Sequence, residues 1–197
     1  MNNIMEKAAV YPYGMQFAPV FRHRQLIKEL EIVKLISPKG WGLSGRDAGE
    51  ADRGPNTKMM VDSDLLESLD NWDTLIVADC NINNRLKCEI VKNIEIAIEH
   101  KKNIVCTLLL DEKTLNHMKM KSEKHQVNFK YQNNYQCELQ NMEINGQHIE
   151  EIYVPIVFIA GLTENTNKFE MLLSTLEMLR QESYNVSAIG TRAYCEL

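Results

Sequence analysis

The residues best suited to bind a ligand lie in one glycine-rich stretch, residues 38–54. It contains five of the chain's nine glycines, together with Trp41 and Arg46. Glycines let the backbone approach a ligand closely, a tryptophan offers a face for stacking, and an arginine can contact an anion. We predict a ligand-binding loop formed by Gly40, Trp41, Gly42, Gly45, Arg46 and Asp47. A surface loop that needs glycine only for its turns is the alternative interpretation.

The same stretch contains the G-x-G-x-x-G pattern of dinucleotide-binding sites, but at a different position in the predicted fold. Residues 40–45 read G-x-G-x-x-G, yet they follow the second predicted strand and no helix is predicted to begin there. The fingerprint holds a pyrophosphate when it joins the first strand to the following helix. We therefore do not expect a nicotinamide cofactor at this loop.

Two further candidates follow other predicted strands. Tyr13 comes just after a strand predicted over 8–11, and Asp79 follows one predicted over 74–78. The carboxyl ends of parallel strands meet at one sheet edge, where open α/β folds bind ligands. An aspartate there can hold a ribose hydroxyl, a metal or an amine, whereas capping a turn is its more common role. The five histidines show no metal-ligand spacing, so we predict no metal site.

A second candidate site lies between a strand predicted over 156–160 and the next helix. In this setting, backbone N–H groups and a helix N-terminus can hold phosphate. With Lys168 in the position of the P-loop lysine, Asn167 replaces a glycine and Phe169 replaces the hydroxyl residue that binds Mg²⁺. We predict anion or nucleotide binding by Asn167 and Lys168, with Arg192 near the next strand end. A structural turn in which Asn167 caps the helix is the alternative.

The elements that must position these residues alternate between apolar β-branched runs and helical patterns. Near-continuous apolar runs are typical of parallel strands buried on both faces. The predicted strands cover 8–11, 32–36, 74–78, 104–109 and 127–131, and the predicted helices cover 17–30, 86–100 and 111–125. This succession predicts an α/β fold, a doubly wound and mostly parallel Rossmann-like sheet over residues 1–131.

The remainder of the chain differs from residues 1–131 in its composition and in its predicted elements. Residues 132–153 are polar and contain Asn145-Gly146, a hairpin turn signal, so we predict a hairpin or linker. A strand, helix and strand pattern then follows over 154–197, ending with a strand predicted over 186–189. One such βαβ unit cannot bury its sheet faces alone. It extends the first sheet, is covered by a partner, or is the start of a degenerate P-loop-like domain in a longer protein, which is what we expect.

Composition restricts the function classes. The chain of 197 residues is 44% hydrophobic and 25% charged, with a formal net charge of −5. This charge argues against a dedicated binder of nucleic acid or anionic membranes. The sequence has no apolar run of about 18 residues and no apolar signal core at its start, so we expect a cytoplasmic protein. Five cysteines without paired spacing fit reduced thiols.

One set of stretches is specific enough to suggest a family: VYPY at 10–13, SPKGWGLSGRDA at 37–48, TNKFE at 166–170 and IGTRAYCEL at 189–197. Together they resemble the peptide maturation system proteins encoded beside radical-SAM peptide maturases, and the resemblance extends over essentially the whole chain. The part from residue 154 is also similar, more distantly, to P-loop proteins of the dethiobiotin synthetase and MobB type. It departs from them at Leu162, Asn167 and Phe169.

The resemblance implies a role in making a ribosomally synthesised, modified peptide, with the precursor peptide or the radical-SAM maturase as partner. We expect an accessory protein that binds a peptide or an anionic small ligand at the carboxyl edge of the sheet. The alternative is an ATP-dependent ligase or kinase-like enzyme, for which a nucleotide is the candidate cofactor. A third interpretation is a module that accepts an added peptide strand at residues 127–131. Assembly as a homo-oligomer is left open.

Overall fold

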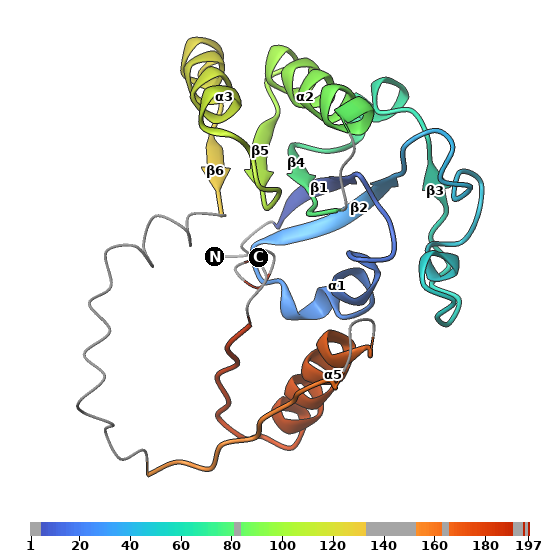
Figure 1. Cartoon of the computed structure of the whole chain (residues 1–197), viewed down its shortest axis with the longest axis vertical. Helices are drawn as coiled ribbons and strands as arrows, with labels where there is room; N and C mark the ends of the chain where they lie inside the picture. The colour runs from blue at the N-terminus through green and yellow to red at the C-terminus, as the bar shows by residue number, and fades with distance from the viewer. Residues whose placement is uncertain (1–4, 81–83, 133–152, 163–165, 191–194, 196) are drawn as a thin grey trace.

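The computed structural model describes residues 5–80, 84–132, 153–162, 166–190, 195 and 197 (Figure 1). Its strands are β1 (Glu6–Tyr11), β2 (Leu30–Ile36), β3 (Val61–Asp62), β4 (Thr74–Val77), β5 (Asn103–Cys106) and β6 (Phe129–Tyr131). Its α-helices are α1 (Ala18–Arg22), α2 (Asn84–Glu99), α3 (Glu112–His125) and α5 (Lys168–Gln181). Three short 3₁₀ helices complete the described elements: η1 (Arg24–Leu26), η2 (Ala48–Ala51) and η3 (Leu66–Asn71).

The six strands form one sheet in the order β3-β2-β1-β4-β5-β6, and all neighbours are parallel. The order reverses between β1 and β4, because β2 and β3 follow one another on one side of β1, whereas β4, β5 and β6 follow one another on its other side. This is the doubly wound Rossmann order, so the predicted fold class is confirmed. A crevice at the carboxyl edge is expected at this reversal point.

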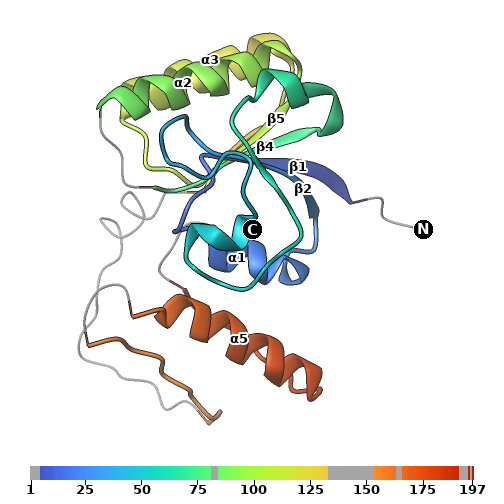
Figure 2. The same cartoon turned by 90° about the vertical axis from the view of Figure 1, so that its right-hand side faces the viewer.

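Helices cover both faces of the sheet, with α2 and α3 on one face and α1 and α5 on the other (Figures 1 and 2). Successive residues of a strand point to opposite faces. In β1, Ala9 and Tyr11 pack in the core under α2, whereas Ala8 and Val10 pack with Phe21 of α1. Burial on both faces explains why the strands read as continuous apolar runs.

Predicted and observed elements agree best where the apolar pattern is long. α2 and α3 lie within two residues of their predicted ranges, and Asp111 caps α3 by accepting a hydrogen bond from the Thr114 amide at 2.9 Å. The helix predicted over 17–30 is shorter, because it ends at Arg22 and continues only as η1. β3 has two residues and was not predicted from the sequence.

The C-terminal part differs from the sequence prediction. The strands predicted over 156–160 and 186–189 have no strand pairing, and Phe158 and Ile189 are 87% and 94% exposed. A strand is stable only when another backbone satisfies its N–H and C=O groups, and no described strand lies beside these segments. The helix between them does form, as α5. The hairpin predicted within 132–153 lies almost entirely outside the described residues.

Helix α5 packs against α1 rather than belonging to a separate sheet. Leu176 of α5 is buried, and Phe169 packs against the core on the α1 face. Charged groups complete the contact, because Arg22 of α1 donates hydrogen bonds to Asp52 and to Glu170 of α5. No helix in the described part of the chain is long and apolar enough to cross a membrane.

Candidate ligand-binding site

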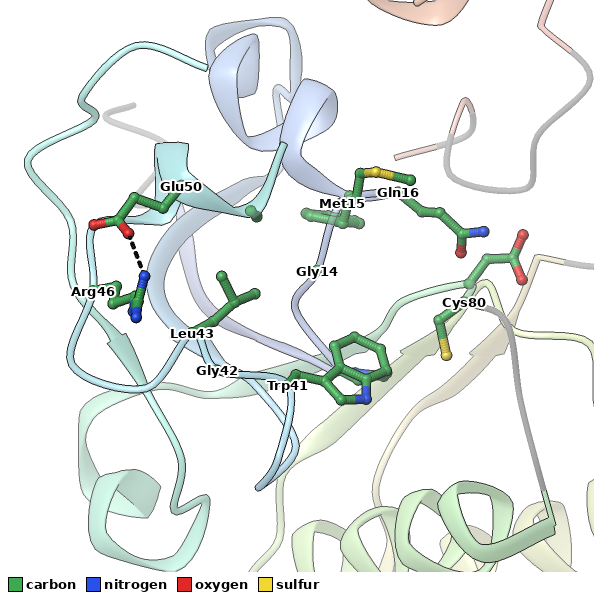
Figure 3. Close-up of a pocket in the computed structure, with 13 residues that line it drawn as sticks. Gly14, Met15, Gln16, Trp41, Gly42, Leu43, Arg46, Glu50 and Cys80 are labelled. Atoms are coloured by element: carbon green, nitrogen blue, oxygen red, sulfur yellow. Dashed lines mark hydrogen bonds and ion pairs between the residues drawn. The ribbon is translucent and has the colours of Figure 1, made fainter. Parts of the chain in front are cut away.

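A pocket of about 450 Å³ lies at the carboxyl edge of the sheet, where the strand order reverses (Figure 3). Three segments line it: the turn after β1, the loop after β2 and the end of β4. The lining residues are Pro12, Gly14–Phe17, Trp41–Leu43, Arg46, Glu50, Ala51, Asp79 and Cys80. Its size is typical of small-ligand sites, which are mostly apolar with a few polar groups.

The turn after β1 forms one wall of the pocket. The Gly14 carbonyl accepts hydrogen bonds from the amides of Phe17 and Ala18, at 3.1 and 3.2 Å, and so leads the chain into α1. Phe17 is buried beneath the pocket, whereas Met15 is 56% exposed. The wall is therefore fixed at its base and presents a thioether side chain to solvent.

Tyr13, predicted as a ligand-binding residue, holds the loop instead. Its side chain is buried, and its hydroxyl donates to the Ala48 carbonyl at 2.9 Å. Its ring meets Phe21 edge to face, with centroids 6.0 Å apart. Burial, followed by the nearby charge of Asp52, raises the pKa of Tyr13 well above its usual value. Tyr13 thus ties η2 to the α1 face and does not line the pocket.

The loop after β2 follows the glycine pattern of its sequence. Gly40, Gly42 and Gly45 have φ values of +97°, +75° and +74°, a region in which side chains are strained. Of these three, only Gly42 lines the pocket. The other two shape the loop that presents Trp41, whose side chain is 39% exposed.

Asp47 stabilises the loop from within. Its carboxylate accepts hydrogen bonds from the amides of Gly49 and Thr57, at 2.8 and 2.9 Å. Desolvation opposes ionisation here, but these hydrogen bonds outweigh it and lower the pKa of Asp47. Asp47 does not line the pocket, so its observed contacts are those of a loop anchor.

Arg46 lines the pocket beside a carboxylate. Its guanidinium lies 3.0 Å from Glu50 in an ion pair whose side chains are both more than half exposed. Exposed pairs contribute little to stability. Each member can therefore rearrange at small cost when a ligand arrives.

The end of β4 supplies Asp79 and Cys80. The Asp79 amide donates to the hydroxyl of Thr107 at 3.1 Å, which fixes the chain as it leaves the strand. Burial and the charge of Asp79 raise the pKa of the Cys80 thiol to about 12. The thiol is therefore protonated at neutral pH and is a poor nucleophile.

Four of the residues predicted at this edge lie together around one pocket: Trp41, Gly42, Arg46 and Asp79. Met15, Gln16, Leu43 and Glu50 also line it and are not among the predicted residues. Met15 and Gln16 lie in the turn after the first strand, and that strand borders the reversal point. Their position in the sequence is therefore the signal that identifies them. Leu43 and Glu50 carry no comparable signal.

The second predicted site is only partly described, because Arg192 lies outside the described residues. Asn167 has a φ of +53° and precedes α5, and its side chain makes no capping hydrogen bond. A β-carbon on Gly161 would stand 2.0 Å from the Thr166 hydroxyl, so the described ends of this loop are in close contact. Glu170 brings a negative charge to the first turn of α5, beside Lys168. The described residues contain no cluster of three or more His, Cys, Asp or Glu side chains that could hold a metal ion.

No family model and no curated protein matches the sequence. Among solved structures, S. aureus homoserine dehydrogenase at pH 7.0 shares 15% identity over 66% of this chain and 33% of its own, with a TM-score of 0.47. GenD2 from gentamicin A biosynthesis, in complex with NAD, shares 13% over 64% of this chain and 34% of its own (TM-score 0.46). Dihydrodipicolinate reductase from Paenisporosarcina sp. TG-14 shares 14% over 67% of this chain and 48% of its own (TM-score 0.47). The chain spans about a third to a half of the length of these proteins. The likeness concerns the fold and says nothing about ligand or reaction.

The turn after β1, where Rossmann folds often bind a dinucleotide, does not carry the glycine fingerprint of those sites. The ring of Trp41 fills the space over Gly14, because a β-carbon on Gly14 would stand 2.6 Å from its Cζ3 atom. Pro12 has no N–H to offer a phosphate. Ser37 follows β2 where dinucleotide sites place an acidic residue for the ribose.

Proposed function

We propose that the protein is an accessory component of peptide maturation that binds a segment of a precursor peptide in this pocket. The observation that carries the proposal is a pocket at the strand-order reversal whose exposed surface includes Met15 and Trp41. Partly exposed apolar side chains around a few polar groups are typical of surfaces that recognise side chains of a partner. The resemblance to peptide maturation system proteins supplies the identity of the peptide.

The chemistry of the pocket supports binding rather than catalysis. Its lining residues include no histidine, and the one thiol, Cys80, has a raised pKa. Nucleophilic catalysis needs a group activated by a neighbouring base or by a lowered pKa. The described lining side chains offer neither arrangement, so they give no support to covalent catalysis in this pocket.

Tryptophan fluorescence offers a direct test, because Trp41 lines the pocket whereas Trp72, the other tryptophan, is 1% exposed and packs in the core with residues of α2. Titrating the full chain with the precursor peptide encoded beside its gene should give a saturable change in emission. The change should disappear in Trp41→Ala and persist in Leu66→Ala, which removes an exposed side chain from η3. Calorimetry that detects no association with the peptide would overturn the proposal.

A nucleotide is the second candidate ligand, because the strand order is the one in which many nucleotide-binding folds place their crevice. Calorimetric titration with ATP, with and without Mg²⁺, tests it. We expect no binding. Magnesium-dependent binding that is lost in Lys168→Ala but kept in Lys39→Ala would instead support the ATP-dependent enzyme.

A further inference from the structure

The indole of Trp41 is held in a fixed position in the pocket. Its ring lies against the backbone of Gly14, and its amide donates a hydrogen bond to the Pro38 carbonyl at 3.2 Å. The Gly45 amide donates to the Val61 carbonyl at 2.8 Å, so the segment that carries the indole is tied to the start of its loop and to β3. A side chain that is ordered before a ligand arrives loses little conformational freedom on binding.

The side chains around this indole are apolar. Met15 and Trp41 are 56% and 39% exposed, and Leu43 and Ala51 line the same pocket. Figure 3 shows Met15, Leu43 and the ring of Trp41 around Gly14. An apolar group that enters this space removes apolar surface of both partners from water, which is the main favourable contribution to most association.

The charged residues that line the pocket already have partners. Arg46 is paired with Glu50 at 3.0 Å. Asp79 takes part in a further interaction besides the hydrogen bond from its amide to Thr107. The Cys80 thiol is neutral, because burial raises its pKa to about 12. A charged ligand would have to compete with these partners, whereas a neutral apolar group leaves them in place.

Two of the lining groups favour an aromatic ring over an aliphatic group of the same size. Pairs of aromatic rings in edge-to-face or offset arrangements are more favourable than the area they bury implies, and part of the Trp41 ring is exposed for such a contact. The thioether of a methionine also makes favourable contacts with aromatic rings, and Met15 lines the pocket. An aliphatic side chain gains neither interaction.

We propose, on the basis of the proposed function, that the pocket recognises an aromatic side chain, phenylalanine or tyrosine, of the bound peptide. The ring of the peptide packs on the indole of Trp41 and contacts the thioether of Met15. The Arg46–Glu50 pair stays intact beside it, so the pocket selects a neutral ring over a charged side chain.

Capped tripeptides test this selection one side chain at a time. The probes are Ac-Gly-Phe-Gly-NH₂, its cyclohexylalanine analogue, Ac-Gly-Lys-Gly-NH₂ and Ac-Gly-Glu-Gly-NH₂, titrated into the full chain while amide NMR shifts are followed. The phenylalanine peptide should bind about threefold to tenfold more tightly than the cyclohexylalanine peptide, which has a similar shape but no π system. Burial alone would favour the cyclohexyl ring, because it exposes more apolar surface in water. The lysine and glutamate peptides should bind most weakly.

Matched variants locate the preference for the aromatic ring. Trp41→Leu keeps an apolar side chain without a ring and should make the phenylalanine and cyclohexylalanine peptides bind equally. Met15→Leu should reduce the preference at least about twofold. Met120→Leu removes an exposed thioether from α3, away from the pocket, and should leave the preference unchanged. Circular dichroism spectra that overlay for all three variants ensure that folding does not explain the difference.

The other outcomes are distinguishable. Equal binding of the phenylalanine and cyclohexylalanine peptides, tighter binding of a charged peptide, or a preference that persists in Trp41→Leu overturns the aromatic selection. So does binding of no tripeptide while the whole precursor peptide still binds, and in each of these cases the proposed function stands if the precursor binds.

A nucleobase could also pack on an indole, so adenosine is titrated as a separate probe. We expect it to bind more weakly than the phenylalanine peptide. Tighter binding of adenosine would show that the pocket takes a nucleobase, and recognition of a peptide side chain is then wrong. An aromatic preference among the tripeptides without any binding of the precursor peptide would overturn the proposed function and leave the selection standing. If neither the tripeptides nor the precursor bind, both fail.

Discussion

The ring of Trp41 covers Gly14, so that a β-carbon at position 14 would stand 2.6 Å from Cζ3 of the indole. This contact joins the turn after β1 to the loop after β2, the two segments that form most of the pocket. At position 14 the obstacle to a larger residue is this ring and not the backbone, whose φ lies outside the left-handed region. The position of the Trp41 ring therefore depends on the absence of a side chain at Gly14, a residue far from Trp41 in the sequence.

Replacement of Trp41 by alanine should abolish peptide binding with little effect on stability. The side chain is 39% exposed, so we expect a loss of about 1 kcal/mol or less in the free energy of unfolding. Trp72→Ala, which empties a buried site, should cost roughly 3–5 kcal/mol. Urea unfolding of both variants makes the comparison. A large loss of stability in Trp41→Ala would show that the indole belongs to the core.

Gly14→Ala should displace Trp41 while the fold persists. The three atoms nearest to the new methyl group all belong to the ring of Trp41, a side chain that can rotate, so the emission of Trp41 should shift to the red and acrylamide should quench it more efficiently. Gly49→Ala is the contrasting variant, because its β-carbon would stand 2.0 Å from the backbone oxygen of Pro55. That strain cannot be relieved by a rotamer change and should cost roughly 1–3 kcal/mol. Equal losses of stability in the two variants would contradict this distinction.

Arg22→Ala should release α5 from α1. The guanidinium is only 15% exposed and bonds to both Asp52 and Glu170, and the hydrogen bonds to Asp52 raise the pKa of Arg22 further above its usual value. Losing one partner of a half-buried pair should cost roughly 1–3 kcal/mol and increase amide exchange in α5. Arg46→Ala, which breaks an exposed pair, should change stability by less than about 0.5 kcal/mol. Unchanged exchange in α5 would show that apolar packing alone holds the helix.

Acidification should weaken the attachment of α5. His23 Nδ1 lies 2.7 Å from Glu177 Oε2, and this hydrogen bond lowers the pKa of Glu177 below its ordinary value of 4.5. A carboxyl group whose pKa is lower in the folded state than in the unfolded state stabilises the folded state. This stabilisation is complete at pH values above the ordinary pKa and is lost as the pH falls through the lowered pKa. Glu177→Gln should therefore be less stable than the parent at about pH 7, and the difference should shrink as the pH falls below the ordinary pKa and through the lowered one. Thermal unfolding across this range provides the measurement, and a stability difference that stays constant would contradict it.

The strands β1, β4 and β5 were predictable because each contains a run of apolar residues of the kind that favours a strand. The C-terminal runs around Phe158 and Ile189 read the same way, yet they are exposed. Periodicity reports which segments favour a strand, but pairing depends on a neighbouring backbone that local sequence does not specify.

The part of the site that lies at the ends of strands was predictable from the sequence. Asp79 lies where its strand predicts, and the glycines bend the loop as their type predicts. The roles of Tyr13 and Asp47 were not predictable, because they depend on contacts with Ala48 and Thr57 that only the folded loop creates. Leu43 and Glu50 also line the pocket, and neither carries a sequence signal that would have placed it there.

The hydrogen bonds between Arg22 and Asp52 have a thermodynamic consequence. Asp52 directly follows η2, whose Glu50 and Ala51 line the pocket, and Arg22 also holds Glu170 of α5. A ligand that shifts η2 therefore changes the free energy with which α5 attaches to α1. By reciprocity, whatever displaces α5 would then change the affinity of that ligand by the same factor.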